Sequence, residues 1–311
     1  MNVVQKSRAL GLSIGLIAAS AVLMPISAQA ATLYVTGVDR IYKFASDGSQ
    51  TTFATGLTNT LNLTFDAIGN LFASDGTSGI VYKFASDGSK TTFASGLNRP
   101  RGLAFDATGN LFVADAGAGT VSKFTPDGTS RTTFTTGLST PVGVAFDASG
   151  NLFTAESNSG AINKFTPDGT SKTAFATGLS NTRGLAFDAS GNLFATNTGS
   201  GDETIYKFTP DGISKTVFAT GLSGAFGLAF DENGNLFEAD QSSGTIYRFT
   251  PDGTSKTVFA TGISGTAGLA FDFSSASTST AVPEPFTIVG TLIGGTAALR
   301  MRKKLKSGGK V

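Results

Sequence analysis

The chain has 311 residues, with 23 basic and 22 acidic side chains, a formal net charge of +1, and no cysteine, histidine or tryptophan. Without cysteine there is no disulfide framework, thiol nucleophile or cysteine-ligated metal. Without histidine, the Ser-His-Asp triad and histidine-ligated zinc are excluded. Any catalysis would have to use carboxylates, lysine, tyrosine or an oxygen-ligated cation.

Residues 1–30 have the pattern of a secretory signal peptide. Lys6 and Arg8 precede an apolar run over about residues 9–26, and Ala28-Gln29-Ala30 has the small-x-small form that signal peptidase cleaves. The sequence therefore predicts export, with signal peptidase as a transient partner. An uncleaved N-terminal membrane anchor is the alternative.

Residues 31–273 form a repeat array. The dipeptide Phe-Asp recurs six times at spacings of 40 to 43 residues, with its aspartates at Asp66, Asp106, Asp147, Asp188, Asp231 and Asp272. One complete unit holds four short strand-like runs, with Gly109-Asn110 between the first two and Asp127-Gly128 between the last two. Both dipeptides are typical of tight hairpins because glycine and asparagine accept positive φ. Four strands in about 41 residues predict one β-propeller blade.

The two ends of the array complement each other. The first unit lacks its first strand and begins at Leu33, whereas the last retains only a first strand, residues 268–272. We therefore predict one all-β domain, a six-bladed β-propeller closed by three N-terminal strands plus one C-terminal strand, which leaves no free edge in the ring. The phenylalanine after each lysine, as in Phe84 and Phe124, is expected in the core between blades.

Three segments of the unit carry a family resemblance. Gly-Leu-Ala-Phe-Asp at 102–106, Gly-Asn-Leu-Phe-x-Ala-Asp at 109–115 and Lys-Phe-x-Pro-Asp-Gly at 123–128 resemble NHL-type propeller repeats. They are more distantly similar to the six-bladed lactonase and gluconolactonase group. The resemblance implies that the residue before Gly-Leu-Ala-Phe lies on the ligand-binding face.

That residue differs from unit to unit. It is Leu61, Arg101, Val142, Arg183, Phe226 or Ala267. Arg101 and Arg183, helped by Arg99, are candidates for binding carboxylates or sulfates of a polymer. Phe226 is a candidate for stacking on a sugar ring. Ordinary surface variation is the alternative.

A second set of candidates ends the second strand of each unit. Asp75, Asp115, Glu156, Asn197 and Asp240 carry oxygens that could bind calcium; the alternative is that each caps its own turn. Glu238 replaces a small or apolar residue and shares a strand face with Asp240, roughly 7 Å away. Candidate metal ligands are thus Glu156, Asn197, Glu238 and Asp240, the last two also serving as a possible acid/base pair. A solvated edge charge is the alternative for Glu238.

Residues 274–281 are a Ser/Thr-rich linker, and residues 282–311 have the pattern of a sorting signal. Pro283-Glu284-Pro285 precedes an uncharged apolar stretch, 286–299. As a helix it would span roughly 21 Å, short of a hydrocarbon core of about 30 Å. A basic cluster follows, which favours the cytoplasmic side; it includes Arg300, Arg302, Lys303 and Lys304.

This order resembles the PEP-CTERM sorting signal of Gram-negative bacteria. The resemblance implies transient anchoring in the inner membrane through the short helix, removal of the tail by an exosortase, and delivery to the cell surface or extracellular matrix. A plain tail anchor is the alternative.

The net charge divides unevenly along the chain. The leader has two basic residues, and the tail from Glu284 onward has six basic residues and one acidic one, so the middle keeps 15 basic and 21 acidic residues, a net charge of −6. This argues against nucleic acid as a partner. The pattern favours an exported, non-enzymatic propeller that binds a polysaccharide or a protein, with no cofactor except a possible calcium ion. The alternative is a lactonase-like hydrolase that depends on an oxygen-ligated metal.

Overall fold

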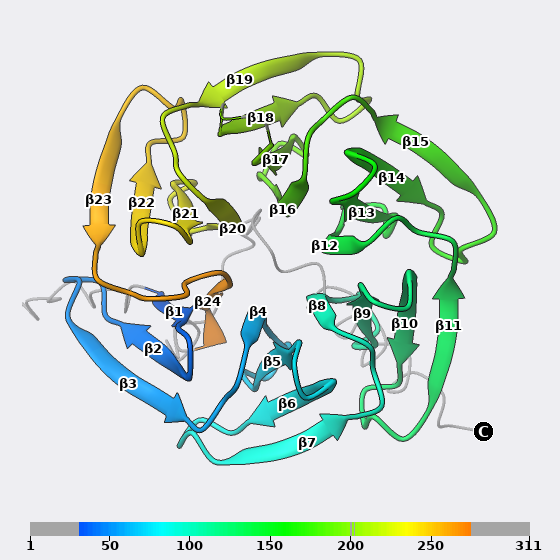
Figure 1. Cartoon of the computed structure of the whole chain (residues 1–311), viewed down its shortest axis with the longest axis horizontal. Helices are drawn as coiled ribbons and strands as arrows, with labels where there is room; N and C mark the ends of the chain where they lie inside the picture. Colours follow the sequence, from blue (N-terminus) through cyan, green and yellow to red (C-terminus); the bar gives the residue numbers. More distant parts are fainter. Residues whose placement is uncertain (1–30, 200, 202, 275–311) are drawn as a thin grey trace, which may run out of the picture.

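The computed structural model describes residues 31–199, 201 and 203–274, so the predicted leader and sorting signal lie outside the described residues. Within the described residues, 24 strands form six four-stranded antiparallel sheets that surround a central axis as blades (Figure 1). No α-helix occurs in this part of the chain, and none of its segments is a helix long and apolar enough to cross a membrane. The predicted all-β six-bladed propeller is confirmed.

The blades follow one another along the chain. Blade 1 contains β4 (Thr60–Phe65), β5 (Leu71–Asp75), β6 (Ile80–Phe84) and β7 (Lys90–Ala94). Blade 2 contains β8 (Pro100–Phe105), β9 (Leu111–Asp115), β10 (Thr120–Phe124) and β11 (Arg131–Thr135). Blade 3 contains β12 (Pro141–Phe146), β13 (Leu152–Glu156), β14 (Ala161–Phe165) and β15 (Lys172–Ala176). Blade 4 contains β16 (Thr182–Phe187), β17 (Leu193–Asn197), β18 (Thr204–Phe208) and β19 (Lys215–Ala219). Blade 5 contains β20 (Ala225–Phe230), β21 (Leu236–Asp240), β22 (Thr245–Phe249) and β23 (Lys256–Ala260).

The sixth, closing blade joins the two ends of the array. Its strand order is β24-β1-β2-β3, with β1 (Thr32–Thr36), β2 (Arg40–Phe44), β3 (Gln50–Thr55) and β24 (Leu269–Asp272). β24 pairs antiparallel with β1, from Thr32 opposite Asp272 to Val35 opposite Leu269. The predicted closure by three N-terminal strands and one C-terminal strand is confirmed.

The core lies between neighbouring blades. The phenylalanines that follow the repeated lysine or arginine are at most 3% exposed, as predicted, and they are Phe84, Phe124, Phe165, Phe208 and Phe249. In blades 1 to 5, a phenylalanine on the second strand packs edge-to-face with two others; Phe72, for example, lies 5.0 Å from Phe93 and 4.9 Å from Phe105 between ring centroids. Burying each such ring stabilises the fold by about 1.5–3 kcal/mol, so the same contact repeated around the ring holds the blades together.

The innermost strands approach one another unusually closely, and this requires glycine. A Cβ atom on Gly143 would lie 2.0 Å from the Arg183 carbonyl oxygen, and one on Gly184 would lie 2.1 Å from that of Phe226. The residue just before each of these glycines is the variable one singled out above. The motif glycine therefore draws the variable side chains together around the central axis.

Candidate functional site

The ring has two faces, and the variable residues lie on one of them. In blade 2, Pro100 at the start of β8 is paired with Asp115 at the end of β9, whereas Phe105 is paired with Leu111 beside the Asp106–Asn110 turn. We call the face where the first strands begin the mouth face, and the opposite one the turn face. The variable residues and the ends of the second strands thus share the mouth face.

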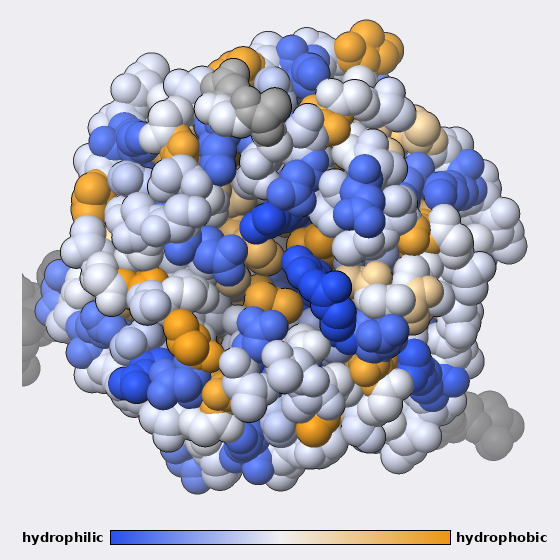
Figure 2. All heavy atoms as spheres, viewed as in Figure 1, coloured by the Kyte–Doolittle hydropathy of each residue, from blue (hydrophilic) through white to orange (hydrophobic). Residues whose placement is uncertain are grey.

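The centre of the mouth face is a shallow cavity over an apolar cluster, which we call the plug. The plug consists of Leu61, Val142, Phe226 and Ala267, all less than 9% exposed and in mutual contact. Arg101 and Arg183 line the same cavity. Figure 2 shows this arrangement as a central hollow in which hydrophobic side chains lie between strongly hydrophilic ones. Four of the six variable positions therefore fill the channel, and two bring cations to it.

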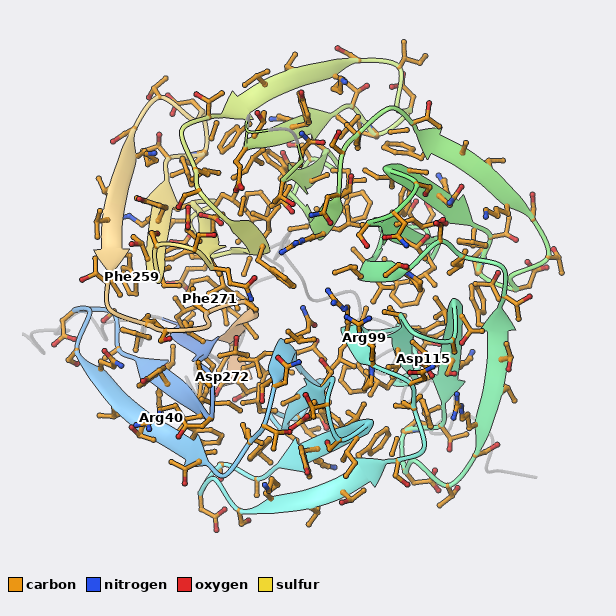
Figure 3. All side chains as sticks on the ribbon, in the orientation of Figure 1. Arg40, Arg99, Asp115, Phe259, Phe271 and Asp272 are labelled. Atoms are coloured by element: carbon orange, nitrogen blue, oxygen red, sulfur yellow. The ribbon has the colours of Figure 1, made fainter. Side chains whose placement is uncertain are left out.

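Arg101 is a half-buried cation that has no counter-ion among the described residues. Its Nε is buried and has no hydrogen-bond partner within the described part of the chain. Burial, together with the charges of Arg99 and Arg183, lowers the pKa of Arg101 to about 10, so the guanidinium stays protonated at neutral pH. Arg99 itself is exposed and extends beside the central opening (Figure 3). The three predicted arginines therefore form one cationic group.

Arg183 is held in place by its neighbours. Its guanidinium carbon lies 5.0 Å from the centre of the Phe226 ring, and its Nε donates to Asn181 Oδ1 at 3.4 Å. Burial lowers the pKa of Arg183, and the Glu203 carboxylate opposes this shift. Because Phe226 is 5% exposed and lies beneath Arg183, it is not free to stack on a sugar. The expectation of a stacking platform is corrected: Phe226 supports Arg183 and completes the plug.

The carboxylates and amide at the ends of the second strands bind backbone amides of the mouth face. Each accepts an N–H from the residue 17 positions earlier: Thr58 to Asp75, Asn98 to Asp115, Ser139 to Glu156, Ser180 to Asn197 and Ser223 to Asp240. Glu156 also accepts from the Asn163 side chain. Each group thus fixes the connection that enters its own blade. Asp75 and Asp240 also accept N–H groups of their own turns, from Ser78 and Ser243, as the capping alternative expects.

The metal candidates are spread over separate blades. Glu156 belongs to blade 3, Asn197 to blade 4, and Glu238 and Asp240 to blade 5. Among residues 31–199, 201 and 203–274, no three acidic side chains come together as a possible metal site. Within this part of the chain, the predicted calcium ligands do not converge.

Glu238 is not a solvated edge charge, and that interpretation is wrong. Its side chain is fully buried on β21, where Oε1 accepts from the Phe226 N–H at 3.3 Å and Oε2 has no partner among the described residues. Burial, and next the Asp240 charge, raise the pKa of Glu238 well above its usual value. Through its contact with the Phe226 N–H, the side chain lies directly behind the plug.

Glu203 is a further part of this region that the sequence did not identify. Its Oε2 accepts from the Ala225 N–H at 2.9 Å. Together with Asp240, which binds the Ser223 N–H at 2.7 Å, and Glu238, it fixes the segment that presents Phe226. Its signal in the sequence is the connection between β17 and β18, which is two residues longer than the corresponding connection in blades 1, 2, 3 and 5.

Comparison with known proteins supports the fold and the repeat. Residues 97–124 match the family model of the NHL repeat. Among curated proteins, none matches the chain significantly. A chain in the crystal structure of a nidogen/laminin complex is similar, with a TM-score of 0.72 and 21% identity, over 78% of this chain and 99% of that one.

Two further similar structures bear the name gluconolactonase. One, from Xanthomonas campestris, has a TM-score of 0.62 and 19% identity over 68% of this chain and 79% of that one. The other, a putative gluconolactonase, has a TM-score of 0.63 and 18% identity over 76% of this chain and 89% of that one. At these identities the likeness shows the propeller fold, which binding proteins and enzymes share.

Proposed function

We propose that this protein is an exported binding protein of the cell surface or extracellular matrix. In this proposal the mouth face binds an anionic group of a polysaccharide or protein ligand, and no reaction is catalysed. The observation that carries the proposal is Arg101, a half-buried cation with an unpartnered Nε beside a second half-buried arginine. A carboxylate or sulfate would supply the missing acceptor in the paired geometry that guanidinium groups favour.

Binding to immobilised glycans and matrix proteins tests this function. We expect the mature protein to bind acidic ligands, and Arg101→Ala or Arg183→Ala to lose about 1.5–3 kcal/mol of binding free energy, as for hydrogen bonds to charged groups. Arg248→Ala is the matched control, because Arg248 is exposed on β22 beside the turn face. Binding that survives both mouth variants would exclude this surface.

The proposed surface localisation and processing are tested by the mass of the protein recovered from the cell surface. The leader and sorting patterns support processing at both ends. We expect a protein that starts near Ala31 and ends near Pro285. Recovery of the full-length mass at the surface would refute removal of the tail.

A metal-dependent, lactonase-like hydrolase is the second candidate. It is supported by the buried carboxyl group of Glu238 behind the mouth, whose pKa is raised by burial, and by the gluconolactonase names among the similar folds. A cation bound only by the folded state would raise Tm by an amount that grows with the logarithm of its concentration relative to its Kd. A melting temperature that calcium leaves unchanged, in wild type and in Glu238→Gln alike, would exclude this candidate.

A further inference from the structure

We infer that the mouth accepts one carboxylate presented end-on, such as a uronic acid at the end or at a branch of a polysaccharide, rather than a polyanion laid across the ring. This inference rests on the proposed function and names the ligand class of the same site. Three features of the mouth carry it: a narrow cavity, cations confined to part of the ring, and acidic surroundings.

The cavity at the centre of the ring is too small for a polysaccharide chain to pass through. Its volume is about 30 Å³, which is room for one or two water-sized groups. The plug residues Leu61, Val142 and Phe226 line it together with the two arginines, so a carboxylate group fits between the arginines while the sugar ring that carries it stays outside. Such a ligand must enter and leave from the same side.

The cations occupy only blades 2 and 4, with Val142 of blade 3 between them. The same three blades have a non-glycine residue in the left-handed region just before the first strand: Arg99 at φ 60°, Thr140 at φ 57° and Asn181 at φ 49°. Such conformations are unfavourable for side-chain-bearing residues, above all β-branched ones, and persist where the surroundings hold them.

Hydrogen bonds hold these three residues in the left-handed conformation. The carbonyl oxygens of Arg99 and Thr140 accept backbone N–H groups of Ala116 and Ser157 at 3.2 and 3.1 Å. The Asn181 carbonyl accepts from Thr198 Oγ1 at 3.0 Å. These bonds fix the entry to the strands that carry Arg101 and Arg183, and both arginines line one small cavity. A planar carboxylate offers two acceptor oxygens, one for each arginine.

The surroundings disfavour a polyanion. The region between leader and tail has a net charge of −6, and the Glu203 carboxylate lies close enough to act on Arg183. A polymer with many charges would be repelled by the rest of the ring. A ligand with one charge on a neutral body meets only the cationic mouth.

Titration calorimetry on the mature protein separates these cases. The probes are methyl glucuronide, methyl glucoside as its neutral counterpart, and polygalacturonate cut to several lengths at constant total uronate. We expect methyl glucuronide to bind and methyl glucoside not to bind. Polygalacturonate binding should rise in proportion to the number of chain ends.

Variants test the assignment to the two arginines. We expect Arg101→Ala and Arg183→Ala to weaken methyl glucuronide binding at least tenfold. Arg101→Lys, which keeps the charge but not the paired donors, should weaken it by an intermediate factor and guards against misfolding of the alanine variant. Arg40→Ala, on an exposed arginine paired with Asp39, should leave it unchanged.

Two outcomes would overturn the inference in different ways. Arginine-dependent binding that strengthens with polymer length, and not with the number of ends, would mean that the ligand lies across the ring; the proposed function would stand and the end-on mode would fail. Absence of arginine-dependent binding to every acidic glycan and matrix protein would reject the proposed function itself.

Discussion

Glu238 shows how one substitution in a repeat changes local chemistry. At its position the other blades have Val35, Ala73, Val113, Thr154 and Ala195. A carboxyl group buried there has exchanged water for a single backbone donor, Phe226 N–H. Because ionisation in such a place is costly, the group keeps its proton, and the folded state binds that proton more tightly than the unfolded chain does.

Glu238 should therefore make the protein less stable as pH rises. Below about pH 4.5 the group is protonated in both states and contributes no pH dependence. Above that value the unfolded chain releases the proton while the folded state retains it, so stability falls by about 1.4 kcal/mol per pH unit until the raised folded-state pKa is reached. Glu238→Gln, which is neutral at every pH, should remove this slope in denaturant titrations.

Asp240 should make stability change with pH in the opposite direction to Glu238. Burial acts to raise its pKa, but hydrogen bonds from Ser223 and Ser243 outweigh burial and leave the pKa below the usual value. Its stabilisation is present above the unfolded pKa and is lost as pH falls through the lowered one. Asp240→Asn should therefore cost stability at pH 7.

The Glu238 prediction has a clear contrary outcome. If the free energy of unfolding changes with pH equally in wild type and in Glu238→Gln, then Glu238 is ionised in the folded state.

Among the elements, the innermost strand of each blade determines the shape of the mouth, because these strands surround the central axis. Each of them needs a residue without a Cβ where the neighbouring strand passes, except in blade 1, where Asn62 stands and its Oδ1 accepts from the Leu103 N–H at 3.1 Å. This difference predicts which positions on the first strands tolerate a side chain.

Gly184→Ala should destabilise the ring because its Cβ would lie 2.1 Å from the Phe226 carbonyl oxygen, a backbone atom that cannot move aside. The expected cost is about 1–3 kcal/mol, as for overpacked cores, or several degrees in Tm. The matched variant Asn62→Ala already has space for a Cβ and should lose only about 1 kcal/mol, one hydrogen bond. If the Gly184→Ala protein has the same Tm as the wild-type protein, the blades can move apart to make room for the Cβ atom.

The strands and turns could be predicted from the sequence, whereas the details of the site could be predicted only in part. Gly109-Asn110 and Asp127-Gly128 mark turns because their backbone conformation is a local property. Arg101 and Arg183 were found because they depart from the repeat. The role of Phe226 was wrong, since a repeat pattern cannot tell which neighbour covers a side chain. Glu203 was missed because it contacts Ala225, 22 residues away in the next blade.

For the whole molecule, closure of the ring is the step on which the other contacts depend. β24 supplies the partner for one edge of β1 and shields Leu33 and Val35, which are at most 1% exposed. Counting the Phe-Asp and Asp-Gly motifs predicted this closure, because a missing first strand at one end and a surplus one at the other can pair only in a ring.

A chain that stops after Gly268 should therefore lose cooperative melting, since it lacks β24 and exposes the edge of β1. A chain that stops after Ser274 is the control and should melt like the mature protein. The measurement is circular dichroism against temperature with size-exclusion chromatography, because an uncovered strand edge favours association. Identical melting of the two chains would show that three strands suffice in the closing blade.

The closing blade also determines how the molecule would respond to mechanical load. Ser274 follows Asp272 at the turn face, whereas the arginines lie at the opposite face. If the C-terminal end of the chain is attached to the cell surface and a ligand at the mouth pulls on the opposite face, the force runs lengthwise along β24. The rungs of the β24–β1 ladder are then loaded together rather than one after another. Under tension, the lifetime of the folded state would be set by the rate at which this pair shears.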